Sequence, residues 1–192
     1  MRRSLLLLAL PLLGAAACGG DKAPAGATDS APASTTAAPA AAADPQDDMA
    51  AIAGYRLTMD KLDQHFAAQR NLMEAYTKMT PAEREAAKVQ MEGGDANSLD
   101  AMAAKYARVP AINDAIKDAG LTAREFTLMS LSLVQAGMAA SVLKMRPNDD
   151  ADSLAREMKA SIENIRFLQQ NEAEITRKQK ALEAEMQAAG VT

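Results

Sequence analysis

Residues 47–192 show almost no alternation of apolar and polar residues and few runs of β-branched residues. Alanine, leucine, methionine, glutamate, lysine and glutamine dominate this stretch, and these residues favour helix. A half-buried strand requires alternation with a period of two, so the pattern leaves little room for a sheet. The stretch is long enough for one domain with a single core. We therefore expect an all-α fold over residues 47–192.

Glycine and proline divide this domain into a helical bundle of about five to six helices. The first long helix is expected over residues 47–79, with apolar residues that repeat every seven positions. Pro110 begins a shorter helix and Gly120 ends it. The last long helix is expected over residues 151–188. We predict that the long first and last helices pack antiparallel, and that a helix over residues 126–145 completes the core.

Two segments carry the side chains of a helix start. Residues 80–83 read Thr-Pro-Ala-Glu, a capping box with proline at the first helical position. Further along, Thr122 is expected to accept the backbone N–H of Glu125, while the Glu125 carboxylate reaches back to the Thr122 N–H. Leu121 and Phe126 occupy the two positions of a hydrophobic staple.

The helix that follows has no charged residue between Phe126 and Leu143. A run of this length allows a transmembrane interpretation. Small and polar residues interrupt it, however, and they favour a central helix packed on several sides by others. These residues are Ser130, Ser132, Gln135, Gly137 and Ser141.

The first 17 residues have the three parts of a secretory signal peptide. Arg2 and Arg3 give a positive start, and the apolar run Leu5–Leu13 is too short to span a bilayer. Residues 14–17 are small, and Cys18, the one cysteine of the chain, follows them. A disulfide within the chain is therefore impossible.

The residues before Cys18 resemble the lipobox of bacterial lipoproteins, in which small residues precede an invariant cysteine. Ala15 stands where that family usually has leucine. The resemblance implies cleavage after Ala17, a thioether-linked diacylglycerol on Cys18 and acylation of the new amino terminus. Because Gly19 rather than aspartate follows, it also implies the outer membrane, with the domain facing the periplasm. The alternative is an ordinary signal peptide cut at the same bond, which leaves a free thiol.

Residues 18–46 are expected to form a disordered tether behind the lipidated cysteine. Of the 28 residues after Cys18, 11 are alanine, 4 proline, 3 glycine and 5 serine or threonine. No aromatic or large aliphatic side chain is present, so little apolar area is available to offset the entropy of ordering. A flexible coil of this length spans roughly 30 Å, which would hold the domain clear of the lipid headgroups.

Net charge excludes one class of partner. The chain has a formal charge of −4, and removal of Arg2 and Arg3 leaves 19 basic against 25 acidic residues, or −6. An acidic domain is a poor candidate for binding nucleic acid. We expect a membrane contact through the lipid on Cys18, an envelope protein as a further partner, and no nucleic acid.

No motif of an enzyme, cofactor or metal site is present. His65 has Ala68 and Gln69 at the spacings where a second metal ligand would stand, so we expect a histidine at the surface or at a boundary. The acidic run 148–152 lacks the glycine and glutamate of a calcium loop and is better explained as a helix cap. The methionines are expected to fill the core. We predict no catalytic residues, no cofactor and no metal.

A second resemblance involves the run from Pro110 to Ile112 and the later run from Ala119 to Thr122, with Glu125 and Phe126. These residues resemble a set of uncharacterised secreted or lipid-anchored bacterial helical proteins. The resemblance implies a helical domain and brings no assigned activity.

Two functional hypotheses follow. In the first, a membrane-anchored lipoprotein serves as a non-enzymatic interaction or structural module of the cell envelope. In the second, a small apolar ligand binds between the long helices, where bundle sites occur. Polar groups would then orient the ligand, and the candidates are Tyr55, Tyr76, Tyr106 and Gln69.

The lipid anchor can be tested by Cys18→Ser. Two or three acyl chains anchor a protein stably, whereas the serine variant offers no thiol for the first of them. We expect the variant to move from the membrane fraction to the soluble envelope fraction in cell fractionation. Unchanged membrane association would contradict lipidation at this residue.

Overall fold

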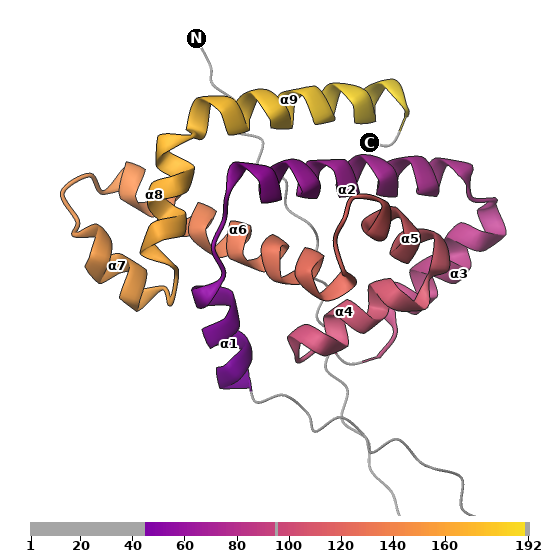
Figure 1. Ribbon diagram of the computed structural model, residues 1–192, viewed down its shortest axis with the longest axis horizontal. Coiled ribbons are helices and arrows are strands. Elements are labelled where there is room, and N and C mark those ends of the chain that lie inside the picture. The colour runs from indigo at the N-terminus through magenta and orange to yellow at the C-terminus, as the bar shows by residue number, and fades with distance from the viewer. Residues whose placement is uncertain (1–44, 95, 191–192) are drawn as a thin grey trace, which may run out of the picture. The chain divides into compact units, whose positions relative to one another are not determined.

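The computed structural model describes residues 45–94 and 96–190, and this part of the chain forms nine helices and no strand (Figure 1). The all-α fold is confirmed, although the helices outnumber the five to six expected. They are α1 (Pro45–Gly54), α2 (Met59–Lys78), α3 (Pro81–Glu92), α4 (Leu99–Arg108), α5 (Pro110–Asp118), α6 (Ala123–Met145), α7 (Ala151–Glu157), α8 (Ile162–Gln170) and α9 (Glu172–Ala188).

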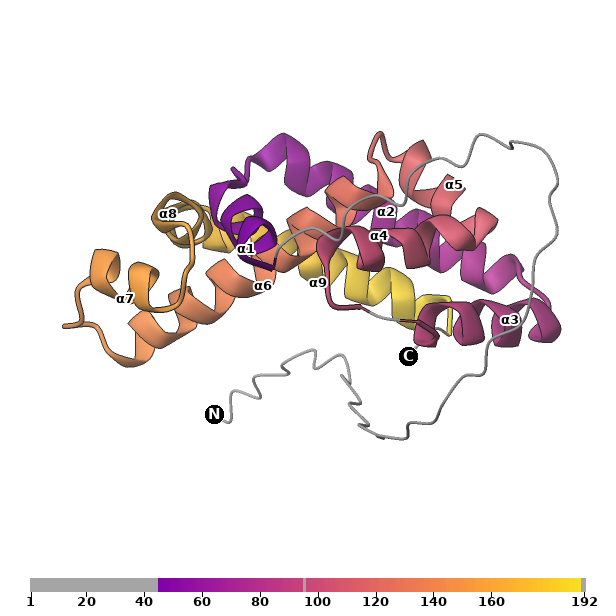
Figure 2. The same cartoon turned by 90° about the horizontal axis from the view of Figure 1, so that it is seen from below.

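Helix α6 is the central element, as the sequence predicts. It packs against α1, α4, α5, α7 and α8, and Figure 2 shows it among the helices from both halves of the chain. Its length and hydropathy match those of a membrane span, yet 44% of its apolar window is buried inside the protein. Val134, Met138 and Met145 remain exposed on its outer face. The helix is therefore apolar on both faces, which accounts for the uncharged run in the sequence.

The prediction of one long first helix is wrong, because this segment forms two helices. Helix α1 ends at Gly54, and α2 begins at Met59 after a new N-cap, Thr58, whose side chain accepts the N–H of Lys61 at 3.3 Å. The apolar seven-residue repeat continues across the break, which is why the periodicity concealed it.

Asn164 of α8 holds the segment that joins α1 to α2. Its Oδ1 accepts the backbone N–H of Leu57 at 2.9 Å, and its Nδ2 donates to the carbonyl of Tyr55 at 2.7 Å. The Asn164 side chain is only 2% exposed, so both bonds are made away from water. One amide thereby satisfies two backbone groups that a continuous helix would have paired internally.

The prediction of one long last helix is also wrong, because residues 151–188 form three helices. Helix α7 ends in a turn at Lys159, and Ser161 then caps α8 by accepting the N–H of Asn164 at 3.3 Å. A second break lies at Asn171, whose Nδ2 donates to the Phe167 carbonyl at 2.8 Å. Two capping residues, Ser161 and Asn171, thus divide the segment that the sequence analysis treats as one helix.

Helices α2 and α9 lie side by side and run parallel, so the predicted antiparallel pairing is wrong. Asp63 pairs with Lys178 at 2.5 Å and Arg70 with Glu185 at 3.9 Å, so residue numbers rise in the same direction along both helices. Figure 1 shows the reason: α6 runs back across the molecule, and α8 then returns the chain to the end at which α2 begins.

Most of the local helix signals behave as predicted. The Thr80 capping box is complete, with the Thr80 N–H donating to Glu83 at 2.7 Å and the Glu83 N–H donating to Thr80 at 3.3 Å. Thr122 accepts the N–H of Glu125 at 3.1 Å. The Glu125 carboxylate does not return to Thr122 but accepts the Tyr55 hydroxyl at 3.4 Å. Tyr55, 70 residues away in the sequence, therefore replaces Thr122 as the hydrogen-bond donor to the Glu125 carboxylate.

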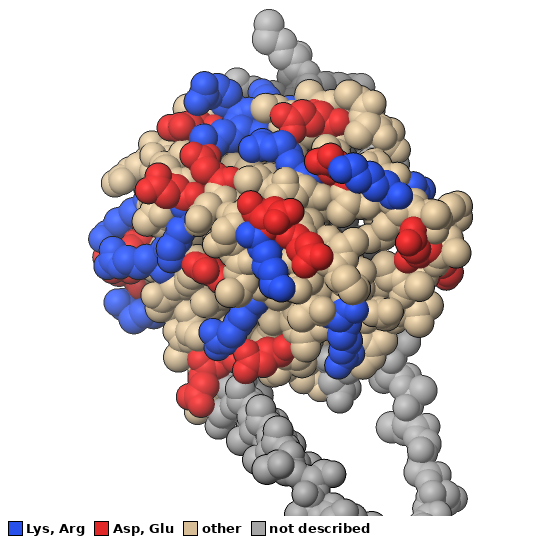
Figure 3. Space-filling model, turned by 45° about the vertical axis from the view of Figure 1, so that its right-hand side comes forward, with Lys and Arg blue, Asp and Glu red and all other residues tan. Residues whose placement is uncertain are grey.

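Acidic and basic side chains are intermixed on the face shown in Figure 3. Ion pairs on the helix surfaces include Glu74–Lys78 at 2.7 Å and Glu174–Lys178 at 3.7 Å, both at a spacing of four residues. Each such pair contributes only a few tenths of a kcal/mol. The fold therefore depends on its apolar clusters and on buried hydrogen bonds.

Replacing Asn164 with alanine tests the bond between α8 and the α1–α2 segment. The substitution leaves the Leu57 N–H and the Tyr55 carbonyl without a partner, and each buried unpaired group costs about 1–3 kcal/mol. We expect the free energy of unfolding to fall by roughly 2–4 kcal/mol in urea denaturation. Asn97→Ala, at an exposed loop position, is the control and should change stability by less than about 0.5 kcal/mol. Equal effects in the two variants would contradict this role.

Candidate functional site

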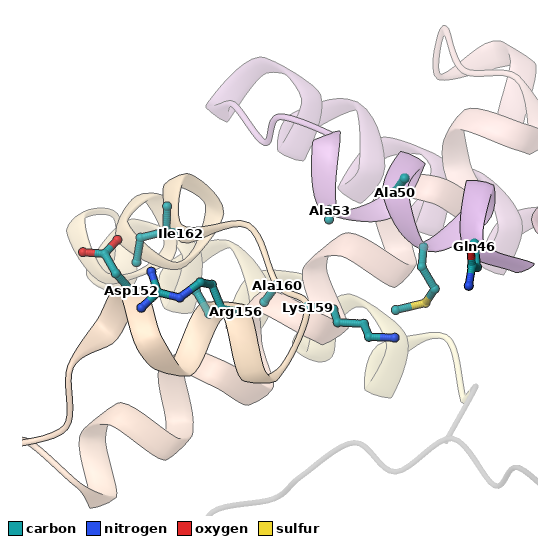
Figure 4. A pocket seen from close by; sticks show the side chains of 10 residues that line it. Gln46, Ala50, Ala53, Asp152, Arg156, Lys159, Ala160 and Ile162 are labelled. Atoms are coloured by element: carbon teal, nitrogen blue, oxygen red, sulfur yellow. The ribbon is translucent and has the colours of Figure 1, made fainter.

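A groove of about 630 Å³ lies between α1 on one side and α7 with the start of α8 on the other (Figure 4). Its surface is mostly apolar, and its ionisable members lie on the α7 side. The residues that line it are Gln46, Met49, Ala50, Ala53, Asp152, Ala155, Arg156, Lys159, Ala160 and Ile162. We name this feature the α1–α7 groove.

The α1 wall is positioned by side chains at both of its ends. Asp48, in the first turn of α1, is buried and accepts the backbone N–H of Leu99 at 2.8 Å, at the start of α4. A carboxylate is favoured there because helix N-termini carry unpaired N–H groups and a positive dipole end. In the last turn of α1, the Ile52 carbonyl accepts the Ser132 hydroxyl of α6 at 3.1 Å.

The α7 wall belongs to an apolar core cluster. Ala155 and Ala160 are 4% and 9% exposed, and they pack with Leu154 and Ile165 of the same cluster. The Asp150 side chain caps α7 by accepting the N–H of Ser153 at 3.1 Å. The acidic run 148–152 is therefore a helix cap, as predicted.

Lys159 forms the turn between α7 and α8 with φ +52°, the left-handed region. The turn closes with the Ala160 N–H donating to the Ala155 carbonyl at 2.8 Å, the pattern of a helix C-cap in which glycine usually stands. A residue with a Cβ costs roughly 1 kcal/mol or more in this conformation. No other described non-glycine residue has positive φ.

The charges around the groove are unevenly paired. Asp152 pairs with Arg166 at 3.4 Å rather than with Arg156, four residues along its own helix. Arg156 instead donates to the Ser153 hydroxyl at 3.3 Å. The Lys159 backbone N–H donates to the Arg156 carbonyl at 3.2 Å, whereas its side-chain ammonium group forms neither an ion pair nor a hydrogen bond with any described residue. The groove thus presents two cationic side chains without a carboxylate partner, in a chain whose net charge is negative.

A second groove, of about 540 Å³, lies among α2, α3 and α5. Its rim is polar, and two of its four acids are engaged: Glu74 pairs with Lys78, and Glu83 accepts from Thr80. The backbone N–H of Thr80 and then its hydroxyl lower the pKa of Glu83. The other two acids are Asp114 and Asp118 of α5.

His65 is a core residue, so the expectation of a surface or boundary histidine is wrong. It is 5% exposed and stacks on Phe126 with ring centroids 5.0 Å apart. Its Nε2 lies 3.2 Å from the Gln69 amide, and its Nδ1 has no hydrogen-bond partner. Burial lowers the pKa of His65 to about 4, so the ring is neutral at pH 7.

The four polar groups suggested as ligand contacts do not face a common cavity. Tyr55 donates to Glu125, and Gln69 lies against His65. Tyr106 packs edge-on against Phe126 at 5.5 Å, whereas Tyr76 is exposed. The space between α2 and α9 is filled by side chains, which include Leu62, Phe66, Ile175 and Leu182. Neither groove lies between these two helices.

Cys18, with the predicted signal peptide and most of the tether, lies outside the described residues. Within residues 45–94 and 96–190, no group of three or more histidine, cysteine, aspartate or glutamate side chains could hold a metal ion. Buried methionines such as Met79 and Met129 pack in the core clusters, in line with the predicted packing role.

The sequence analysis did not identify the residues of the α1–α7 groove, because alanines on separate helices form no local motif.

Comparison with known proteins gives no match: no family model, no curated protein and no solved structure is similar to this chain.

The buried His65 predicts a pH dependence of stability. Its pKa is about 4 in the folded chain and about 6.5 in the unfolded chain. The stabilisation is therefore complete above pH 6.5 and is lost as the pH falls towards 4, by about 3 kcal/mol. We expect the difference in unfolding free energy between the native chain and His65→Leu to change by this amount between pH 7 and pH 4. Parallel pH profiles for the two chains would contradict a buried neutral histidine.

Proposed function

We propose that this chain is a lipoprotein of the cell envelope and that its helical domain is a non-enzymatic binding module. In this proposal the lipid on Cys18 anchors the chain, and the α1–α7 groove is the binding site. The observation that carries the proposal is the groove itself: an apolar hollow of about 630 Å³ with two unpaired cations at its edge.

The lining of the groove supports binding rather than catalysis. Acid–base or nucleophilic chemistry needs a nucleophile or base held within hydrogen-bond reach of a second polar group. The ionisable residues of the groove are Asp152, Arg156 and Lys159, and the one carboxylate is held by Arg166. His65 is buried among aromatic rings and does not line the groove. The groove thus offers apolar area and positive charge.

The predicted anchor supports a role at a membrane surface. A lipidated Cys18 followed by a tether of roughly 30 Å would keep the domain close to the bilayer without embedding it. By its resemblance to lipoproteins without aspartate after the cysteine, we propose the outer membrane, with the domain in the periplasm. An envelope component would then meet the groove at high local concentration.

Two kinds of occupant fit this proposal: a segment of an envelope protein and a small apolar ligand. A volume of about 630 Å³ falls within the roughly 300–1,000 Å³ typical of small-molecule sites, which favours the second. The ligand site proposed here lies between α1 and α7 rather than between the long helices.

Site-specific photo-crosslinking in whole cells tests the binding site. A photoreactive residue at Ala50, in the groove, should yield adducts that the same residue at Ala184, exposed on α9, does not. Mass spectrometry of the Ala50 adducts then separates a protein from a small molecule. Recovery of lipid alone would remove the protein-partner form of the proposal. Identical adduct patterns at the two positions would contradict the groove as the binding site.

A further inference from the structure

We propose that the α1–α7 groove binds a single-chain amphiphile with an anionic head, for which a fatty-acid carboxylate is the simplest example. This inference rests on the proposed function, because it takes the groove as the binding site and names the chemistry of the ligand. Three features of the groove carry it: an apolar floor, a restricted size and an unpaired positive edge.

The floor of the groove is built from small aliphatic side chains. Ala50 and Ala53 project from α1, Ala155 and Ala160 belong to the facing wall, and Ile162 extends that wall into α8. Small side chains on two facing helices leave space that larger ones would have filled. An aliphatic chain placed there would contact the buried cluster to which Ala155 and Ala160 belong, and would remove apolar surface from water on both sides.

The size of the groove favours a small molecule over a protein segment. Ten of the described residues line it, whereas a specific protein interface engages roughly 20–30 residues on each side. Both walls are short, since α1 has 10 residues and α7 has 7. A groove of these dimensions suits one aliphatic chain.

The chemistry of the lining favours an aliphatic ligand over a sugar or a nucleotide. A sugar needs several hydrogen-bonding groups around it, and a base usually stacks on an aromatic ring. No aromatic residue lines the groove, and its polar members are Gln46, Asp152, Arg156 and Lys159. Of the polar members, the cations Arg156 and Lys159 have no carboxylate partner among the described residues.

The cations place the head of the ligand at the α7–α8 turn. In Figure 4 the Lys159 side chain extends from this turn towards α1, while the Arg156 guanidinium lies on the side of Asp152. The carboxylate of Asp152 is paired with Arg166, so it does not neutralise the two cations. A carboxylate or phosphate at the mouth of the groove would therefore find the free Lys159 ammonium group at the edge of the apolar lining.

The backbone of Lys159 supports the assignment. Its positive φ is the conformation that glycine adopts at least cost at the end of a helix. A lysine there strains the turn and places a long cation beside the groove. Strained backbone of this kind is concentrated at ligand sites.

Binding of laurate to the Cys18→Ser variant tests this inference. The full chain with Cys18→Ser can be exported and purified without detergent, which keeps the groove free of added amphiphile. Isothermal titration calorimetry below the micellar concentration should show one site for laurate. Dodecyltrimethylammonium, with the same chain and a positive head, should bind at least about tenfold more weakly, and acetate should not bind measurably. Equal affinity for the two amphiphiles would overturn the inference.

Two pairs of variants locate the site. Ala50→Phe should fill the groove and weaken laurate binding at least about tenfold, whereas Ala184→Phe on α9 should leave it unchanged. Lys159→Gln should weaken laurate binding by about three- to tenfold and should not weaken the binding of dodecyltrimethylammonium, with the exposed Lys180→Gln as control. The Lys159 substitution lies at the surface, so it keeps the test decisive if Ala50→Phe disturbs folding. Laurate binding that none of these changes alters would place the ligand elsewhere.

The outcome separates this inference from the proposed function. If laurate fails to bind while crosslinks specific to Ala50 persist in cells, the ligand class is wrong and the groove remains the binding site. If neither is found, the groove itself is contradicted.

Discussion

The amide of Asn164 sets the direction in which the chain passes from α1 to α2, and the groove depends on that direction. A continuous helix over residues 47–79 would carry α1 along the axis of α2 and away from α7. The segment between the two helices instead runs past α8, where Asn164 supplies one acceptor to Leu57 and one donor to Tyr55. Buried backbone groups need hydrogen-bond partners, and the Asn164 amide supplies them at this bend.

The two walls of the groove are stabilised by different interactions. A helix of ten residues is marginal in water, so α1 depends on contacts with the rest of the domain. It is held by Asp48 at the N-terminus of α4 and by Ser132 at its own last turn, together with the Asn164 bonds just beyond. The α7 wall, by contrast, is part of an apolar cluster that includes Leu143 and Ile165. One wall therefore depends on a few directional bonds and the other on packed area.

The sequence predicts those parts of the fold that are determined within a few residues. The Thr80 cap, the Thr122 cap and the Asp150 cap were all found, because each side chain bonds a backbone group two or three positions away. The break after α1 was missed because its stabilising partner lies 107 residues away in Asn164. Periodicity was misleading there, since the seven-residue repeat continues through residues that are not helical.

Features that depend on packing between helices could not be predicted from local sequence motifs. The parallel course of α2 and α9 follows from the return of the chain through α8, which no local motif records. The burial of His65 depends on Phe126, 61 positions along the chain, which stacks on the ring. The groove is formed by alanines on two helices about a hundred residues apart. Alanine reads as a strong helix former in a sequence, and its small volume becomes a feature only once a second wall faces it.

The position of α1 links the groove to the predicted membrane anchor. Pro45 and Gln46, the last two residues of the tether expected over residues 18–46, belong to α1, so the element that would receive the anchor is also the wall held by few bonds. A ligand that contacts both walls stabilises the arrangement in which α1 faces α7. By linkage, ligand binding and this arrangement of α1 favour each other by the same coupling free energy.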